Sequence, residues 1–240
     1  MKSFFNKLVR VSAKDFYTRL NSALHEQERM FIVTANPETF MIGDRDDAFR
    51  NLLEDEETTI VADGIGVVKA ANMLAIPVQE RIPGVEIAEQ LMKLGNEGSA
   101  SIYLFGAKPE VIAAMKQLIA QQFPKLRLVG CSDGYVKDKD HIFDEIVSYQ
   151  PDIVLVALGI PAQEQLIYRH LHRFSKGIFV GVGGSFDVMS GLKKRAPAFF
   201  IKCNLEWLYR ILSEPSRWKR FYHNNVKFIG MVRSMRRGGK

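Results

Sequence analysis

The residues best suited to chemistry stand directly after short apolar runs. Asp63 follows the run Thr58–Ala62 and precedes Gly64 and Gly66, which let backbone or a ligand approach closely. A half-desolvated carboxylate in this position suits a general base, and an N-cap for the following helix is an equally good interpretation. Arg81, in the stretch Glu-Arg-Ile-Pro-Gly, is suited either to clamp a phosphate or to pair with a neighbouring acid.

Glycine-rich turns resemble dinucleotide-binding fingerprints but do not complete them. The fingerprint Gly-x-Gly-x-x-Gly needs three glycines at a strand-to-helix turn. Lys69 stands at the third position after Gly64 and Gly66, and Phe186 stands there in the turn that begins at Gly181. A P-loop is also absent from the sequence. A nicotinamide-dependent oxidoreductase is therefore disfavoured, although glycine turns before helices remain suited to binding phosphate.

Two pairs of aspartates have the spacing Asp-x-Asp, which holds a divalent metal in many sugar-nucleotide enzymes. They are Asp44 with Asp46 and Asp138 with Asp140, and both pairs lie in polar stretches that open helices. Acids favour such positions because they complement the helix dipole, so we interpret both pairs as structural. The five histidines show no metal-ligand spacing. The sequence therefore predicts neither a metal site nor a cofactor.

Short apolar runs alternate with helical patterns through residues 1–191. Strands are expected at residues 30–35, 58–62, 101–105, 126–130, 152–158 and 177–182, and helices at 12–28, from 37, 85–94, 109–123, 138–149 and 161–174. Continuously apolar strands separated by helices indicate a parallel sheet covered on both faces. We expect a doubly wound, mostly parallel, Rossmann-like α/β domain, which binds ligands at the carboxyl ends of its strands.

The composition is that of an ordinary globular protein. The 240 residues are 47% hydrophobic and 25% charged, which excludes disordered and collagen-like chains. The two cysteines, Cys131 and Cys203, form no CxxC pair, so neither a zinc ribbon nor a disulfide framework is expected. So few cysteines favour a reducing, cytosolic compartment. No run approaches the roughly 18 to 20 apolar residues of a membrane span, and no signal-peptide core is visible.

Charge is distributed unevenly along the chain. Residues 192–240 hold 13 Lys or Arg against two acids, a net +11, whereas residues 1–191 hold 20 basic and 25 acidic side chains, a net −5. We expect a catalytic domain at 1–191 and a basic, amphipathic, helical appendage at 192–240. An anionic partner, either nucleic acid or a membrane surface, suits the appendage, and a solvated basic helix without a partner is the alternative. A chain truncated near residue 191 is expected to stay folded.

Ordered short motifs run along nearly the whole chain. They are Thr34–Pro37, Ala62–Gly66, Arg81–Gly84, Phe105–Pro109, Asp133–Tyr135, Leu158–Glu164, Val182–Asp187, Lys194–Pro197, Leu205–Arg210 and Glu214–Arg217. In content and order they resemble the WecG/TagA/CpsF family of bacterial glycosyltransferases (family 26). The chain departs from the family pattern at Ile160 and Ala162, where alanine and lysine are usual, and we expect small effects on donor contacts because Gln163 and Glu164 remain.

The resemblance implies an inverting, metal-independent transfer of a hexose or N-acetylhexosamine from a UDP-sugar, which is a substrate and not a cofactor. The acceptor would be an undecaprenyl-diphosphate-linked sugar at the inner face of the cell membrane, where the protein would be peripheral. N-acetylmannosamine transfer to GlcNAc, which forms the linkage disaccharide of wall teichoic acid, is the leading expectation. A glucose or galactose transferase of capsule synthesis is the alternative. A homo-oligomer is left open, and nucleic acid is not expected because no nucleic-acid-binding motif is present.

The resemblance also implies roles for individual residues. Asp63 would be the base, and Arg81 with backbone amides would stabilise the departing UDP. The remaining candidates would bind substrate. Thr34, Asn36 and Gln163 would position the donor or the acceptor, Gly106 and Lys108 would bind substrate at a glycine turn, and Tyr135 and Asp187 would contact the nucleotide. Arg210, Arg217 and Arg220 would bind the diphosphate of the acceptor.

Overall fold

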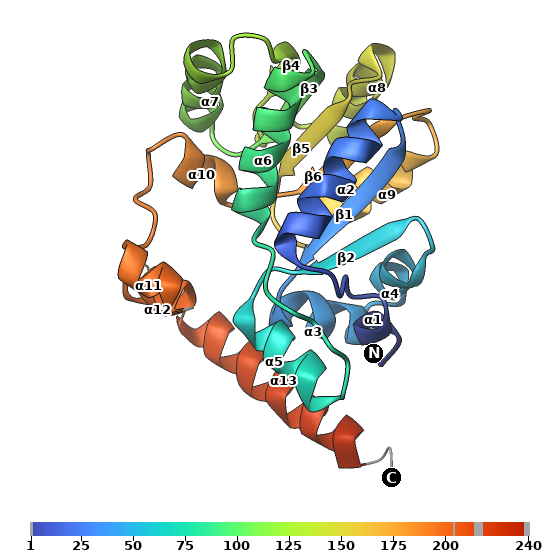
Figure 1. Cartoon of the computed structure of the whole chain (residues 1–240), viewed down its shortest axis with the longest axis vertical. Helices are drawn as coiled ribbons and strands as arrows, with labels where there is room; N and C mark the ends of the chain where they lie inside the picture. Colours follow the sequence, from blue (N-terminus) through green and yellow to red (C-terminus); the bar gives the residue numbers. More distant parts are fainter. Residues whose placement is uncertain (1, 204, 214–217, 238–240) are drawn as a thin grey trace.

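Six parallel strands form one open sheet in the computed structural model, which describes residues 2–203, 205–213 and 218–237 (Figure 1). The strands are β1 (Arg29–Ala35), β2 (Thr58–Ala62), β3 (Ser101–Gly106), β4 (Arg127–Ser132), β5 (Ile153–Ala157) and β6 (Gly177–Gly181). Their order in the sheet is β2-β1-β6-β5-β3-β4, and every neighbouring pair is parallel. The predicted strands and the Rossmann-like α/β class are confirmed, and the sheet is wholly parallel.

Helices cover both faces of the sheet. They are α1 (Lys2–Asn6), α2 (Ala13–His25), α3 (Pro37–Arg45), α4 (Asp47–Glu54), α5 (Ile65–Met73), α6 (Gly84–Glu97), α7 (Pro109–Gln122), α8 (Lys139–Tyr149), α9 (Ala162–Leu171), α10 (Ser185–Met189), α11 (Ala198–Lys202), α12 (Glu206–Ser213) and α13 (Trp218–Arg237). The short helices α1, α4, α5 and α10 were not expected from the sequence, because five to nine residues hold too few turns to show a clear helical period.

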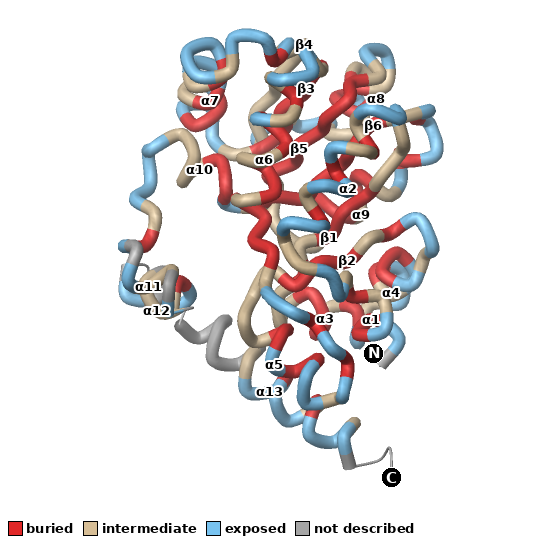
Figure 2. Tube along the Cα trace, viewed as in Figure 1, coloured by how far each residue is buried: buried red, intermediate tan, exposed pale blue. Residues whose placement is uncertain are grey.

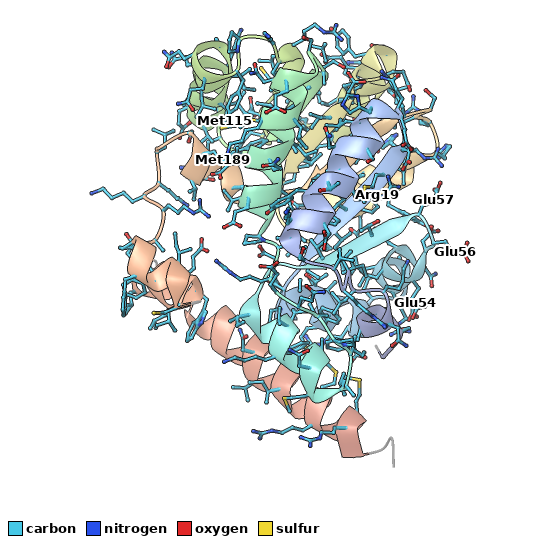
Figure 3. All side chains as sticks on the ribbon, viewed as in Figure 1. Arg19, Glu54, Glu56, Glu57, Met115 and Met189 are labelled. Carbon is cyan, nitrogen blue, oxygen red and sulfur yellow. The ribbon has the colours of Figure 1, made fainter. Side chains whose placement is uncertain are left out.

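Two apolar cores lie on opposite faces of the sheet. Figure 2 shows the buried residues concentrated on the strands and in the helices that pack around them. Successive strand residues alternate between the two cores, as the two-residue period of a strand requires: Phe31 and Val33 belong to one core and Ile32 to the other. The first core is completed by α1, α3, α4, α5, α8, α9 and α13, and the second by α2, α6, α7 and α10. Met189 of α10 packs against the second core, which holds Met115 of α7 (Figure 3).

The C-terminal segment, residues 192–237, leaves α10, passes through α11 and α12, and ends in the long helix α13 beside α3 and α5 (Figure 1). Phe228 and Val232 of α13 are 2% and 1% exposed and belong to the first core. The Phe228 ring lies 6.1 Å from that of Phe5 and 5.7 Å from that of Phe40. The segment therefore completes the core. That a chain truncated near residue 191 stays folded remains a prediction, and this packing counts against it.

The helices also bear on whether the chain could cross a membrane. Over the described ranges, none of them combines the length and the hydropathy needed to span a bilayer.

Candidate active site

The strand register places the ends of β1 and β2 side by side. Ala35 pairs with Ala62, so Asn36 and Asp63 are the first residues beyond the sheet on neighbouring strands. The Asp63 backbone N–H donates to the Ala35 carbonyl at 2.9 Å, which extends the ladder by one bond. Asp63 thus stands at the carboxyl edge of the sheet, where parallel sheets bind ligands.

A turn at residues 81–84 orients the Asp63 side chain. The Gly84 N–H donates to Asp63 Oδ1 at 2.9 Å, and the Ile82 N–H donates to the Ala62 carbonyl at 2.8 Å. Helix α5 begins after Gly64 without a side-chain cap, so the N-cap interpretation of Asp63 is wrong. A carboxylate held in one orientation at this edge is suited to take a proton from a bound hydroxyl.

Thr34 lies against the same turn. A Cβ added at Gly84 would lie 3.2 Å from Thr34 Cγ2, closer than most real contacts, so glycine lets the turn approach β1. Thr34 Oγ1 donates to the Gly181 carbonyl at 2.9 Å, across to β6. Thr34 and Asp63 thus both lie against the turn that contains Arg81, and a shared site for the three residues stays a prediction.

Arg81 pairs with an acid distant in sequence. Its Nη1 and Nη2 both lie 3.4 Å from Glu206 Oε2, and the side chains of the two residues are 16% and 10% exposed. Of the two interpretations that the sequence left open, a phosphate clamp or an ion pair, the structure contains the ion pair. The partner belongs to α12, so the C-terminal segment reaches the edge of the site.

Asn36 caps helix α3. Its Oδ1 accepts from the backbone N–H groups of Glu38 at 2.8 Å and Thr39 at 3.3 Å, and Thr39 Oγ1 accepts from the Asn36 N–H at 3.0 Å. This reciprocal arrangement is a capping box and commits the carbonyl oxygen to the helix. The Nδ2 group is left as the part of Asn36 suited to contact a substrate, which stays a prediction.

Gln163 is buried and joins two loops of the rim. Its Oε1 accepts from the Gly159 N–H at 3.1 Å and the Gly183 N–H at 3.0 Å, and its Nε2 donates to Glu164 Oε1 at 2.7 Å. These bonds tie the loop after β5 to the loop after β6. The structure thus gives Gln163 a positioning role, while direct contact with substrate stays a prediction.

Glu164 is a buried carboxyl that was not among the predicted site residues. It is 1% exposed, and Oε2 has no hydrogen-bond partner within the described chain. Burial raises the pKa of Glu164 to about 7, against the opposing effect of the hydrogen bond from Gln163. Buried carboxylates with raised pKa values cluster at functional sites. Its place in the motif Leu158–Glu164 was the only sequence signal for it.

The candidates after β3 and β4 lie at the other end of the rim. At about 4.8 Å per strand, the strand order places β3 about 19 Å and β4 about 24 Å from β2. Gly106 has φ +115°, and a Cβ there would lie 2.4 Å from the Ala157 carbonyl oxygen, so this turn requires glycine. Lys108 lies 3.8 Å from Glu110 and is 60% exposed, and Tyr135 is 70% exposed. These residues are available to a ligand but do not contact Asp63.

Asp187 and the arginines of the appendage complete the set of candidates. Asp187 of α10 pairs with Lys193 at 3.5 Å, at the start of the C-terminal segment. Arg217 lies outside the described residues. Arg210 and Arg220 belong to α12 and α13, but their side chains lie outside the description. The proposed role of these three arginines stays a prediction.

Aspartates of the two Asp-x-Asp pairs cap helices and form ion pairs. Asp46 Oδ1 accepts from the Phe49 N–H at 3.0 Å, and Asp138 Oδ1 accepts from the His141 N–H at 3.0 Å, so both cap helices. Asp140 lies 2.7 Å from both Arg169 and His170. Within the described ranges, no group of three or more His, Cys, Asp or Glu residues is arranged to hold a metal.

A cavity of about 490 Å³ opens beside Asp138 and Asp140, and Asp63 is not among its lining residues. It is lined by Lys137, Asp138, Lys139, Asp140, Ala162, Gln165, Leu166 and Arg169.

The Rossmann-like sheet carries an oriented carboxylate, and a turn with an arginine, at the edge where parallel sheets bind ligands. The sequence profile of the glycosyl transferase WecG/TagA/CpsF family matches residues 3–240, and the chain belongs to this family. The resemblance seen in the motifs is thereby confirmed. The protein is a glycosyltransferase, and the oxidoreductase and nucleic-acid-binding alternatives are set aside.

Curated relatives carry one functional name. A protein of Bacillus spizizenii (strain ATCC 23059 / NRRL B-14472 / W23) is 40% identical over 206 residues, 85% of this chain and 80% of its own. A protein of Bacillus subtilis (strain 168) is 40% identical over 189 residues, which are 79% of this chain and 73% of the relative. A protein of Staphylococcus aureus (strain MW2) is 38% identical over 192 residues, which are 80% of this chain and 74% of the relative. All three are named N-acetylglucosaminyldiphosphoundecaprenol N-acetyl-beta-D-mannosaminyltransferase.

Proposed function

We propose that this protein transfers N-acetylmannosamine from UDP-N-acetylmannosamine to N-acetylglucosaminyl-diphosphoundecaprenol. The acceptor and the transferred sugar are those in the names of relatives at 38–40% identity, and the match extends over 73–80% of their length. The observation that carries the proposal is Asp63, a carboxylate at the end of β2 whose Oδ1 is held by Gly84. An oriented base beside an arginine is what a single displacement at a sugar carbon requires.

In the proposed reaction, the Asp63 carboxylate accepts the proton of the acceptor hydroxyl while that oxygen attacks C1 of the donor sugar. The new C1–O bond forms as the bond from C1 to the β-phosphate oxygen breaks, and the electron pair leaves with UDP. Attack from the face opposite the leaving group inverts the configuration at C1. In this proposal Thr34 positions the sugar beside Asp63, and its contacts with Gly84 and Gly181 support that role.

The leaving diphosphate needs positive charge, which Arg81 supplies in this proposal without a metal ion. Arg81 begins the turn at residues 81–84, and Gly84 of the same turn orients Asp63, so one turn bears on both the base and the group proposed at the leaving diphosphate. Lys108 and Tyr135, about 19 to 24 Å along the rim, can reach only the nucleotide end of an extended donor bound at Asp63.

The C-terminal segment is proposed to dock on an anionic membrane surface, where the lipid acceptor lies. Six of the ten large apolar side chains exposed in the described chain belong to it: Leu192, Phe199, Trp207, Leu212, Val226 and Ile229. They accompany the net charge of +11 that residues 192–240 carry, a combination that suits the boundary between headgroups and acyl chains. The acidic residues Glu54, Glu56 and Glu57 lie on the opposite side of the molecule from α11 and α12 (Figure 3), which favours one orientation at the surface.

A donor screen tests the proposed function. The full-length protein would be incubated with a synthetic polyprenyl-diphosphate-GlcNAc and one UDP-sugar at a time, and products would be detected by mass. The expected result is a disaccharide with UDP-N-acetylmannosamine and little product with UDP-glucose or UDP-galactose. Efficient transfer of glucose or galactose alone would support a capsule-type transferase in its place.

A further inference from the structure

Glu164 is an acid at a position where an apolar residue would cost the fold less. It lies in the first turn of α9, which packs against β1 and β6, and it is 1% exposed. Its Oε2 has no hydrogen-bond partner among the described residues. Burying a polar atom without a partner lowers stability, and burying a charge lowers it further. Proteins keep such a residue where function requires it, so the neighbours of Glu164 matter.

The other carboxyl oxygen of Glu164 orients the side-chain amide of Gln163. Glu164 Oε1 accepts from Gln163 Nε2 at 2.7 Å. On its other side, Gln163 Oε1 accepts from the N–H groups of Gly159 and Gly183, at 3.1 and 3.0 Å. If the amide turned over, Nε2 would face these two donors and both bonds to the loops would be lost. Glu164 therefore favours the one orientation in which Gln163 joins the loops after β5 and β6.

The end of β6 leaves room for this pair of side chains. A Cβ added at Gly181 would lie 2.5 Å from Gln163 Nε2 and 2.9 Å from Glu164 Oε1, closer than real contacts allow. The carbonyl of the same glycine accepts from Thr34 Oγ1 at 2.9 Å. The pair therefore lies directly against the strand end that orients Thr34, the neighbour of Gly84.

We propose that Glu164 is a positioning residue for sugar transfer, which acts through Gln163 on the loops after β5 and β6 and on the strand end beside Thr34. The inference rests on the proposed function only for the identity of the donor. Because Glu164 is 1% exposed, it works without touching substrate. Its task needs an oxygen that accepts from Gln163 Nε2 and does not need a charge. Glutamine can therefore replace it, whereas a side chain without an acceptor cannot.

The test compares turnover and stability in variants of the full-length protein. Glu164→Met keeps an unbranched side chain and removes the acceptor, so we expect kcat to fall about tenfold or more. Its urea unfolding midpoint is expected to stay the same or rise, because the buried carboxyl is gone. Glu164→Gln is expected to keep most of the turnover. Ile167→Leu, a change of packing at a buried position of the same helix, is the matched control and is expected to keep native turnover.

Backbone hydrogen exchange gives a second readout that needs no donor. We expect the amides of Gly159 and Gly183 to exchange faster in Glu164→Met than in the native protein, because Gln163 no longer holds them. Glu164→Gln is expected to exchange like the native protein. Gly181→Ala, whose Cβ displaces the pair, is expected to resemble Glu164→Met in turnover and exchange.

Native turnover in Glu164→Met would overturn the proposal whatever the exchange rates. A fall in turnover together with a lower unfolding midpoint would also overturn it, since Glu164 would then be a structural residue. Equal losses in the Met and Gln variants would show that the acceptor oxygen is not what matters. If the native protein does not use UDP-N-acetylmannosamine, the proposed donor fails alone. Glu164 is then judged with the donor that the screen identifies, and native exchange at Gly159 and Gly183 in Glu164→Met would still overturn its role.

Discussion

Replacing Glu164 with glutamine should remove a pH-dependent cost of folding. Glu164 is 1% exposed and Oε2 lacks a partner within the described residues, so the folded protein favours the neutral acid. Burial raises the pKa of Glu164 from its ordinary value of 4.5 to about 7. A glutamine side chain at this position would keep an oxygen to accept the Gln163 hydrogen bond but would not titrate.

The size of the effect follows from linkage between protonation and folding. Below pH 4.5 the carboxyl is protonated in folded and unfolded chains alike, so its stability contribution is fully present. As the pH rises toward 7, the unfolded chain releases the proton and the folded chain retains it, and the free energy of unfolding falls. A difference of about 2.5 pH units, at about 1.4 kcal/mol each, predicts a loss of about 3 kcal/mol.

Urea unfolding at pH 5 and pH 8 measures this effect. Native protein and Glu164→Gln would be compared at both pH values, with Glu110→Gln, an exposed glutamate on α7, as the control for loss of a carboxylate. The free energy of unfolding of Glu164→Gln relative to native protein should rise by roughly 2 to 3 kcal/mol from pH 5 to pH 8. A relative stability that is the same at both pH values would refute a buried neutral acid at this position.

Three further predictions concern the C-terminal segment and the expected independence of the activity from a metal ion. Phe228→Ala should lower the free energy of unfolding by about 3 kcal/mol in urea, because it opens a cavity in the first core; an unchanged midpoint would contradict the packing of α13. Replacing Lys227, Arg233 and Arg236, all exposed on α13, with glutamine should weaken sedimentation with anionic liposomes about 10²-fold at unchanged fold. Equal binding would place the membrane contact elsewhere. Excess EDTA should leave transfer activity nearly unchanged, and abolition with rescue by Mn²⁺ would return the Asp-x-Asp pairs to consideration.

The fold was predictable from the sequence because its determinants are local. Each buried strand is a short apolar run bounded by polar or glycine residues, and the helices between them fix a parallel sheet. Asp63 could also be predicted as a candidate site residue, because a carboxylate at the end of a strand stands at the ligand-binding edge of the sheet. The sequence could not show what holds the side chain of Asp63, because the partner of Oδ1 is Gly84, 21 residues away. The role of Asp63 as the base stays a prediction.

Long-range partners explain what sequence analysis missed. Arg81 finds Glu206 at a separation of 125 residues, and no local pattern marks that pair. Glu164 looked like a polar residue in the first turn of a helix, and only the packing of α9 against β1 and β6 reveals its burial. Phe228 stands in a strongly basic stretch that indicated a surface helix. Its burial depends on a contact with Phe5 at the other end of the chain.

Turnover of Asp63→Asn tests the central claim most directly, that the carboxylate at the end of β2 is the base of sugar transfer. Transfer of N-acetylmannosamine to the lipid-linked acceptor would be measured at saturating substrates, with UDP affinity measured on the same preparation. The substitution keeps the size of the side chain and an oxygen to accept the Gly84 N–H but removes basicity. We predict a fall in turnover of about 10²-fold or more with UDP affinity preserved. Near-native turnover would contradict the account and leave Asp63 a structural residue.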